Sequence, residues 1–233
     1  MSIAENLVAI RERIATTARR IGRDPQEVAL MAVSKTHPAS AILEAVAAGQ
    51  HLFGENRVQE FATKHDELAA VEARFHLIGH LQSNKAAKAA ELFDAVDSVD
   101  SPRLAERINE AAARLGRRLD VLIEINVGGE EAKSGLSPES NELFALLDAQ
   151  ARLANLRIQG CMTVPPFTEN PDGSRPYFRR LRQLRDQLRV RSGLELAELS
   201  MGMSHDFEVA IEEGSTCVRV GTAIFGTRSY PEP

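Results

Sequence analysis

Eight short apolar runs, separated by longer amphipathic segments, restrict the fold of this 233-residue chain more than any other feature. An alternation of strand-like and helix-like segments indicates a parallel β-sheet, and strands this apolar are covered by helices on both faces. Eight such units in a chain of about 250 residues are typical of an α/β fold, the (β/α)8 TIM barrel. The runs lie at 28–35, 51–56, 75–81, 95–101, 119–129, 156–164, 196–203 and 216–226.

The segments between these runs have the pattern of helices, and residues 2–22 form an extra amphipathic helix before the first run. No linker or break in composition divides the chain, so we predict one domain over residues 1–233. The alternative fold is a doubly wound open sheet. The predicted helices between strands lie at 38–49, 57–70, 83–93, 102–115, 137–153, 176–191 and 205–214.

Composition and charge exclude several classes of protein. The net charge is −5, which argues against a nucleic-acid-binding protein with its basic surface. Cys161 and Cys217 each stand alone in an apolar stretch, which predicts two reduced, buried thiols rather than a zinc site or a disulfide. The N-terminal segment lacks the apolar region of a signal peptide, and no apolar run is long enough to cross a bilayer. We therefore expect a cytoplasmic protein without nucleic-acid or membrane partners.

Lys35 ends the first apolar run (AVSK), at the edge of the barrel where such folds place their chemistry. If the side chain points into the barrel mouth, loss of hydration favours the neutral amine that a Schiff base requires. If it points outward, it is an ordinary solvated lysine. The residue taken alone favours the second interpretation.

The last two runs contain features of a phosphate site, which in such barrels often follows strands seven and eight. Gly202 and Ser204 open the segment HDFEVAIEEG, whose first backbone N–H groups can bind an anion. Gly221 lets the backbone approach a ligand closely, and Thr222 supplies a hydroxyl donor. Ser204 can also be a helix N-cap, and the two roles are compatible.

Arg219 lies in an otherwise apolar run, where a charged guanidinium needs a partner. One candidate is the pyridine nitrogen of pyridoxal 5′-phosphate (PLP), since arginine is a known partner of that atom. The other is a buried salt bridge with Glu124 or Asp97. A phosphate site and this arginine together make Lys35 a candidate attachment site for PLP.

Three further features receive a structural interpretation. His76 and His80 lie in a strand-like run and would not converge on one ion, so no metal site is predicted. The segment RRLRQLRDQLRVR has leucines at helical spacing, which predicts a helix with a solvated arginine face. The Pro/Gly-rich loop at 165–174 is either a lid or a solvated connection.

Segments along nearly the whole chain resemble the pyridoxal phosphate homeostasis protein family. In chain order they are AVSKTHP, FGENRVQE, FHLIGHLQSNK, INVGGEEAKSGL, GCMTVPP, LSMGMSHDFEVAI and RVGTAIFG. The resemblance implies a fold like the N-terminal domain of alanine racemase, with PLP held as a Schiff base. By position it implies attachment at Lys35, a phosphate cradle of Ser200, Ser204, Gly221 and Thr222, a pyridine-nitrogen contact from Arg219, and a pocket lined by Asn56, His80 and Met201.

The resemblance also implies a role in the homeostasis of PLP and amino acids rather than catalysis. Its implied partners are PLP and other B6 vitamers, with PLP-requiring apoenzymes as candidate recipients. The alternative is an alanine-racemase-like enzyme, which needs acid/base groups on both faces of the substrate carbon. Only Tyr177 and Tyr230 are present, neither at a predicted strand end. We therefore expect a non-catalytic carrier, and a monomer without the racemase-type dimer interface.

Overall fold

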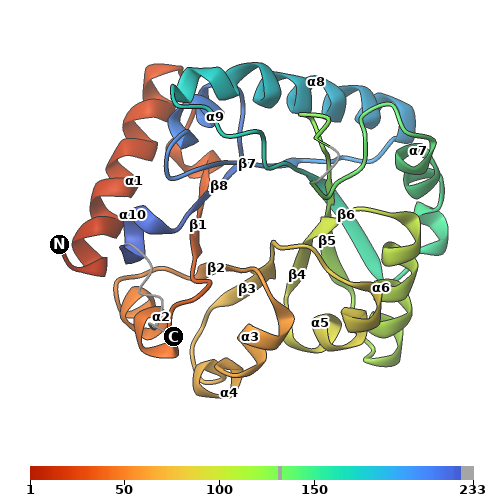
Figure 1. The fold of residues 1–233 in the computed structure, drawn as a ribbon, viewed down its shortest axis with the longest axis horizontal. Helices are drawn as coiled ribbons and strands as arrows, with labels where there is room; N and C mark the ends of the chain where they lie inside the picture. The colour runs from red at the N-terminus through yellow and green to blue at the C-terminus, as the bar shows by residue number, and fades with distance from the viewer. Residues whose placement is uncertain (131–132, 227–233) are drawn as a thin grey trace.

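Eight parallel strands pair in sequence order in the computed structural model, and the eighth pairs with the first, which closes a barrel (Figure 1). The structure describes residues 1–130 and 133–226. The closed barrel confirms the predicted (β/α)8 fold and excludes the open doubly wound sheet. The strands are β1 (Ala29–Val33), β2 (Leu52–Glu55), β3 (Arg74–Leu77), β4 (Ala95–Val99), β5 (Leu119–Glu124), β6 (Leu156–Met162), β7 (Glu198–Met203) and β8 (Cys217–Val220).

Helices form a ring outside the strands, as connections between consecutive parallel strands require (Figure 1). The α-helices are α1 (Ile3–Arg20), α2 (Ala39–Ala47), α3 (Val58–Ala62), α4 (His65–Leu68), α5 (Ala86–Leu92), α6 (Pro102–Arg114), α7 (Asn141–Asp148), α8 (Arg175–Ser192), α9 (Phe207–Glu212) and α10 (Thr222–Phe225). Short 3₁₀ helices are η1 (Pro25–Glu27), η2 (Ser83–Lys85), η3 (Gln150–Arg152) and η4 (Pro171–Ser174).

The predicted extra helix at the N-terminus is α1. A capping box fixes its start, because the Glu5 backbone N–H donates to the Ser2 hydroxyl while the Ser2 N–H donates to the Glu5 carboxylate. Leu7 on its inner face is fully buried, and Asn6 Nδ2 donates to the Ile224 carbonyl oxygen at 2.9 Å. The helix therefore packs against α10, the segment that follows the closing strand.

Several predicted elements differ from the structure; the helix predicted at 57–70, for example, is divided into α3 and α4. The run 216–226, predicted as one strand, is a strand only over Cys217–Val220 and then continues as α10. The whole run is apolar, so its pattern does not separate a buried strand from a buried helix. The helix predicted to start at Ser137 begins at Asn141 instead, because the Ser140 hydroxyl caps it.

The barrel interior holds a buried histidine–aspartate pair. His76 Nδ1 lies 3.1 Å from Asp97 Oδ1. Burial lowers the pKa of His76, but the Asp97 carboxylate outweighs this effect, and the pKa is raised above its ordinary value. His80 lies beyond the end of β3 and contacts Asp100, so the two histidines have separate partners. Among the described residues, no group of three or more His, Cys, Asp or Glu side chains is placed to hold a metal ion.

The cysteines and the arginine-rich helix take the structural roles predicted for them. Cys161 and Cys217 are free, buried thiols, and burial raises the pKa of each to about 12. Leu181, Leu184 and Leu188 form the buried stripe of α8. In the part of the chain that the structure describes, no helix is long and apolar enough to cross a membrane.

Candidate functional site

A cavity of about 540 Å³ opens at the carboxyl ends of the strands. Its volume lies within the range typical of small-molecule sites, about 300–1,000 Å³. Most of the predicted site residues line it, because they end or follow strands whose carboxyl ends meet at this edge of the barrel. Those that line the cavity are Lys35, Asn56, His80, Ser204, Arg219, Gly221 and Thr222.

Lys35 lies two residues beyond the end of β1, and its partly buried side chain lines the cavity. Its Nζ is 3.5 Å from Oδ1 of Asn56, the residue that follows β2. Because β1 and β2 are hydrogen-bonded neighbours, their ends bring the amine and the amide together. Of the two orientations open to Lys35 from the sequence, the structure has the one directed into the barrel mouth.

Ser204, Gly221 and Thr222 lie at the carboxyl ends of β7 and β8 and face the same cavity. Gly221 N donates to Ser204 Oγ at 3.3 Å, which leaves the hydroxyl hydrogen able to donate to a ligand. Thr222 carries a second hydroxyl donor. Ser204 is not the N-cap of α9, a position that Asp206 occupies. The three residues form a small polar cradle with the donors that an anion needs.

The turn that leads into this cradle depends on Gly202. Its φ of 93° is in the left-handed region, which glycine adopts without steric cost. A Cβ at this position would lie 2.5 Å from Ala210 Cβ and 3.0 Å from Phe207 Cα. Both atoms belong to a packed helix, so the backbone would have to move.

We expect Gly202→Ala to destabilise the protein more than Gly193→Ala. Gly193 also has a positive φ, 71°, but a Cβ there would meet nothing within 4 Å. The control therefore carries only backbone strain of about 1–3 kcal/mol, whereas Gly202→Ala adds overpacking of about 1–3 kcal/mol. Urea denaturation of both variants measures the difference. Equal losses of stability would contradict a role for the contact with Ala210.

Arg219 forms part of the cavity wall from inside β8, where its side chain is 3% exposed. It donates to Ser200 Oγ at 2.7 Å and to the Thr163 carbonyl oxygen at 2.7 Å. Its hydrogen-bond partners are therefore neutral groups, not the carboxylates of Glu124 or Asp97 considered from the sequence. Burial lowers the pKa of Arg219, and the charges of Asp97 and Glu124 oppose that shift. An arginine still remains a cation at neutral pH.

The expected ligand contacts of Ser200 and Met201 stay predictions, because neither residue is in the cavity lining. Both are fully buried inside β7 and lie outside the cavity lining. The Ser200 hydroxyl accepts the hydrogen bond from Arg219, and Met201 belongs to the hydrophobic core. Ser200 therefore supports Arg219, and the predicted cradle residues that line the cavity are Ser204, Gly221 and Thr222.

Glu124 is a cavity residue whose position the sequence did not indicate. It ends β5, is 7% exposed, and its Oε1 accepts from Ser134 Oγ at 2.8 Å. Its Oε2 is buried and has no hydrogen-bond partner. Burial raises the pKa of this carboxyl above its ordinary value. Glu124 lies in the middle of the predicted run 119–129, so the sequence did not mark it as a strand end.

His80 lines the exposed side of the cavity, with 58% of its side chain accessible to solvent. Its Nδ1 lies 3.0 Å from Asp100 Oδ2, which fixes the orientation of the ring. Tyr177 belongs to α8 and is not in the cavity lining. Tyr230 lies outside the described residues.

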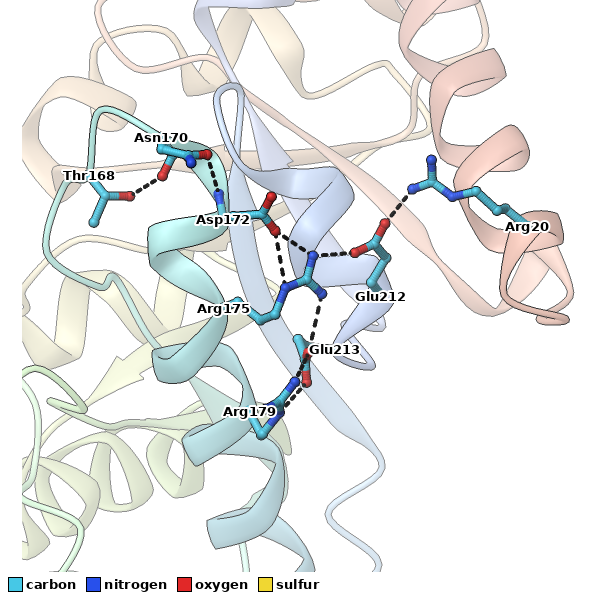
Figure 2. A network of polar contacts seen from close by, with 8 residues as sticks. All are labelled: Arg20, Thr168, Asn170, Asp172, Arg175, Arg179, Glu212 and Glu213. Atoms are coloured by element: carbon cyan, nitrogen blue, oxygen red, sulfur yellow. Dashed lines mark hydrogen bonds and ion pairs between the residues drawn. The ribbon is translucent and has the colours of Figure 1, made fainter.

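The loop after β6, predicted as either a lid or a solvated connection, is held by a network of ion pairs (Figure 2). The Arg175 guanidinium lies between Asp172 at 2.6 Å and Glu212 of α9 at 2.6 Å. Glu213 accepts from both Arg175 and Arg179, at 3.3 and 2.8 Å. The end of the loop is therefore tied to the helix that follows β7.

The same loop contacts the cavity wall through His205. The Nε2 atom of His205 lies 3.1 Å from the carbonyl oxygens of Thr168 and Glu169. The ring of Phe167, 79% exposed, lies 5.4 Å from the His205 ring. The loop is held at Thr168 and Glu169 and again at Asp172. It is therefore better described as a fixed rim of the cavity than as a free connection.

Comparisons with known proteins agree with this geometry. The sequence pattern of the alanine racemase N-terminal domain matches residues 6–229. The pyridoxal phosphate homeostasis protein of Aquifex aeolicus is 45% identical over 230 residues, covering 99% of this chain and 100% of that protein. The protein of the same name from Pseudomonas aeruginosa is 46% identical over 232 residues, covering 100% and 98%.

Among solved structures, PipY of Synechococcus elongatus PCC7942 with PLP bound has 41% sequence identity and a TM-score of 0.84. The match covers 97% of this chain and 100% of PipY. The fold and the residues at the strand ends lead to the same conclusion as the relatives, which match over nearly their full length. The chain belongs to the pyridoxal phosphate homeostasis protein family, whose fold is that of the alanine racemase N-terminal domain.

Proposed function

We propose that this protein binds PLP through a Schiff base on Lys35 and serves the homeostasis of PLP and amino acids. The observation that carries the proposal is that one cavity holds a partly buried lysine, a pair of hydroxyl donors and a buried arginine. PipY, the relative described with PLP bound, supports the identity of the ligand. PLP has an aldehyde, a phosphate and a pyridine ring, and the cavity offers a group for each.

The donor set fits the cofactor. The phosphate is proposed to lie at Ser204 and Thr222, where two hydroxyl groups can donate to its oxygens. Gly221 lies close to β1, since a Cβ there would lie 3.3 Å from the Val33 carbonyl oxygen. When bound, PLP supplies an aldehyde carbon to which an amine can add.

The remaining site residues orient these groups. Asn56 Oδ1 is proposed to hold the Lys35 amine in the cavity, because the two atoms are 3.5 Å apart. Arg219 is proposed to face the ring nitrogen as a cation and so to keep it unprotonated, which weakens the ring as an electron sink. His80 closes the solvent side of the cavity.

Ser204→Ala is expected to weaken the binding of PLP while leaving the binding of pyridoxal, which has no phosphate, unchanged. A hydrogen bond to a charged group contributes about 1.5–3 kcal/mol, which corresponds to roughly tenfold or more in affinity. Absorbance titrations with both ligands measure the two affinities, and Ser137→Ala on the exposed surface is the control. An equal loss for both ligands would place the phosphate elsewhere.

The relatives are named pyridoxal phosphate homeostasis proteins, which supports a proposed role in holding and delivering the cofactor. We propose B6 vitamers as its ligands and PLP-requiring apoenzymes as recipients, with the protein acting as a monomer. The alternative is a PLP-dependent enzyme acting on amino acids, and the pairing of His80 with Asp100 favours it, since an oriented imidazole can transfer protons. Robust conversion between D- and L-alanine by the pure protein would overturn the carrier role.

The Schiff base is tested on the purified protein. We expect a yellow protein with an absorption band at the edge of the visible range. Borohydride should fix the adduct irreversibly, and mass spectrometry of its peptides should place the added mass on Lys35. A protein that takes up no PLP, or an adduct mapped to another residue, would overturn the proposal.

A further inference from the structure

Lys64, which lies between α3 and α4, is a buried lysine outside the cavity lining. Its side chain is 7% exposed, and its Nζ lies 2.8 Å from Glu55 Oε1. The same ammonium donates to the carbonyl oxygens of Ser34 at 3.2 Å and His37 at 3.1 Å. These contacts match the three donors of an ammonium group. The two carbonyls flank Lys35 on either side along the chain.

Carboxylates complete the surroundings of this ammonium. Glu55 is fully buried at the end of β2, and its Oε1 also accepts from Ser34 Oγ at 2.6 Å. Glu60 lies 3.6 Å from Lys64 Nζ, and its Oε1 accepts from the backbone N–H of Thr36. The turn after β1 is thus held at Ser34, at Thr36 and at His37. We call Lys64, Glu55 and Glu60 the turn clamp.

The clamped turn contains an unfavourable backbone conformation. Thr36 has a φ of 67°, and this left-handed region is a true outlier for a β-branched residue. Such a conformation costs free energy and persists only where surrounding contacts impose it. The turn clamp supplies those contacts, because it binds the carbonyls on both sides of Thr36 and the N–H of Thr36 itself.

We propose that Lys64 is a positioning residue for Lys35: its ammonium holds Thr36 left-handed, and this conformation directs the Lys35 amine into the cavity. The inference rests on the proposed attachment of PLP to Lys35 and adds to that site a residue that sets the direction of the lysine side chain. It gives the buried charges a role beyond stability. A buried ion pair contributes little net stability compared with an apolar replacement, whereas breaking it by removing one partner is costly.

A general structural role for Lys64 predicts a different result from a positioning role. If Lys64 only supports the fold, its loss lowers stability, and relief of strain at Thr36 has no specific effect on the cofactor. If Lys64 holds Thr36 in place, a residue that adopts a positive φ unaided can replace the clamp. Glycine is that residue, since it populates this region without steric cost.

The experiment compares Lys64→Met, Thr36→Gly and the double variant, with Lys88→Met as the control. Lys88 is 46% exposed and pairs only with Glu91 on the same helix in the described structure. The rate of Schiff-base formation with added PLP is followed by absorbance, the attachment site is mapped after borohydride reduction, and folding is checked by circular dichroism and thermal unfolding.

We expect Lys64→Met to slow Schiff-base formation on Lys35 by roughly tenfold to a hundredfold. Thr36→Gly alone should leave the rate near that of the unaltered protein. The double variant should recover most of the lost rate without recovering the lost thermal stability. The rescue of rate alone separates positioning from support of the fold.

Glu60→Ala keeps the test decisive if Lys64→Met does not fold. Glu60 is partly exposed, and this change removes the acceptor of the Thr36 N–H. It should slow Schiff-base formation less than Lys64→Met, and Thr36→Gly should again restore the rate. A rate that is unchanged in folded Lys64→Met, or slowed without rescue by Thr36→Gly in either background, overturns the inference. Absence of an adduct on Lys35 in the unaltered protein overturns the proposed function instead.

Discussion

Lys35→Ala is expected to remove the PLP adduct from the first strand end and to leave the barrel folded. The side chain is partly buried at the cavity and contacts Asn56 at 3.5 Å. Its removal leaves no large void in the core and takes away the nucleophilic amine. Absorbance should lose the band at the edge of the visible range, and reduction should add no mass to the peptide that contains residue 35.

Peptide mapping decides this result better than colour does, because a second lysine lines the cavity. Lys133 Nζ donates to the Pro165 carbonyl oxygen at 3.2 Å and pairs with Glu130 at 2.5 Å. Lys133→Ala is therefore the matched control and should retain the full adduct on Lys35. An adduct in the unaltered protein that maps to Lys133 would contradict the assignment of Lys35.

Arg219→Glu is expected to shift the absorption band of bound PLP to longer wavelength. A carboxylate in place of the guanidinium raises the pKa of the ring nitrogen, so the nitrogen becomes protonated. Arg219→Met is the control, since it removes the cation without adding a negative charge. A protein with Arg219→Glu that binds PLP with an unshifted band would place the ring nitrogen elsewhere.

Both changes at Arg219 are also expected to lower stability. The Ser200 hydroxyl and the Thr163 carbonyl oxygen would lose a buried donor, and each unsatisfied buried acceptor costs about 1–3 kcal/mol. Chemical denaturation without PLP measures this loss separately from binding. Stability equal to that of the unaltered protein would mean that these hydrogen bonds contribute nothing.

The barrel could be predicted from the sequence because its strands are short apolar runs and the helices between them are amphipathic. The pattern fails where a segment is apolar throughout, and the run 216–226 therefore concealed α10. It also fails at caps, since Ser137 and Ser140 are the same residue type and the structure has Ser140 as the cap.

The sequence indicated which residues would gather near the site, but not which way each side chain points. Lys35 follows β1 and lines the cavity, whereas Ser200 lies inside β7 and its hydroxyl accepts from Arg219. The resemblance to a family predicts that Ser200 contacts the ligand, and in the structure its hydroxyl accepts a hydrogen bond from Arg219. Lys64 gave no signal, because its partners Ser34 and His37 are distant in sequence and meet it only after β1 and β2 pair.

The pairing of β1 with β8 has a consequence for the time at which the cofactor can be captured. Lys35 is synthesised early, whereas Arg219, Gly221 and Thr222 belong to the last elements of the described chain. A nascent chain that still lacks β8 has the proposed attachment amine but neither the arginine nor most of the anion cradle. Closing contacts between the two ends of a chain also form late in folding, because their loop-closure entropy is large. Tight retention of PLP would then mark a chain in which β8 has been synthesised and the barrel has closed.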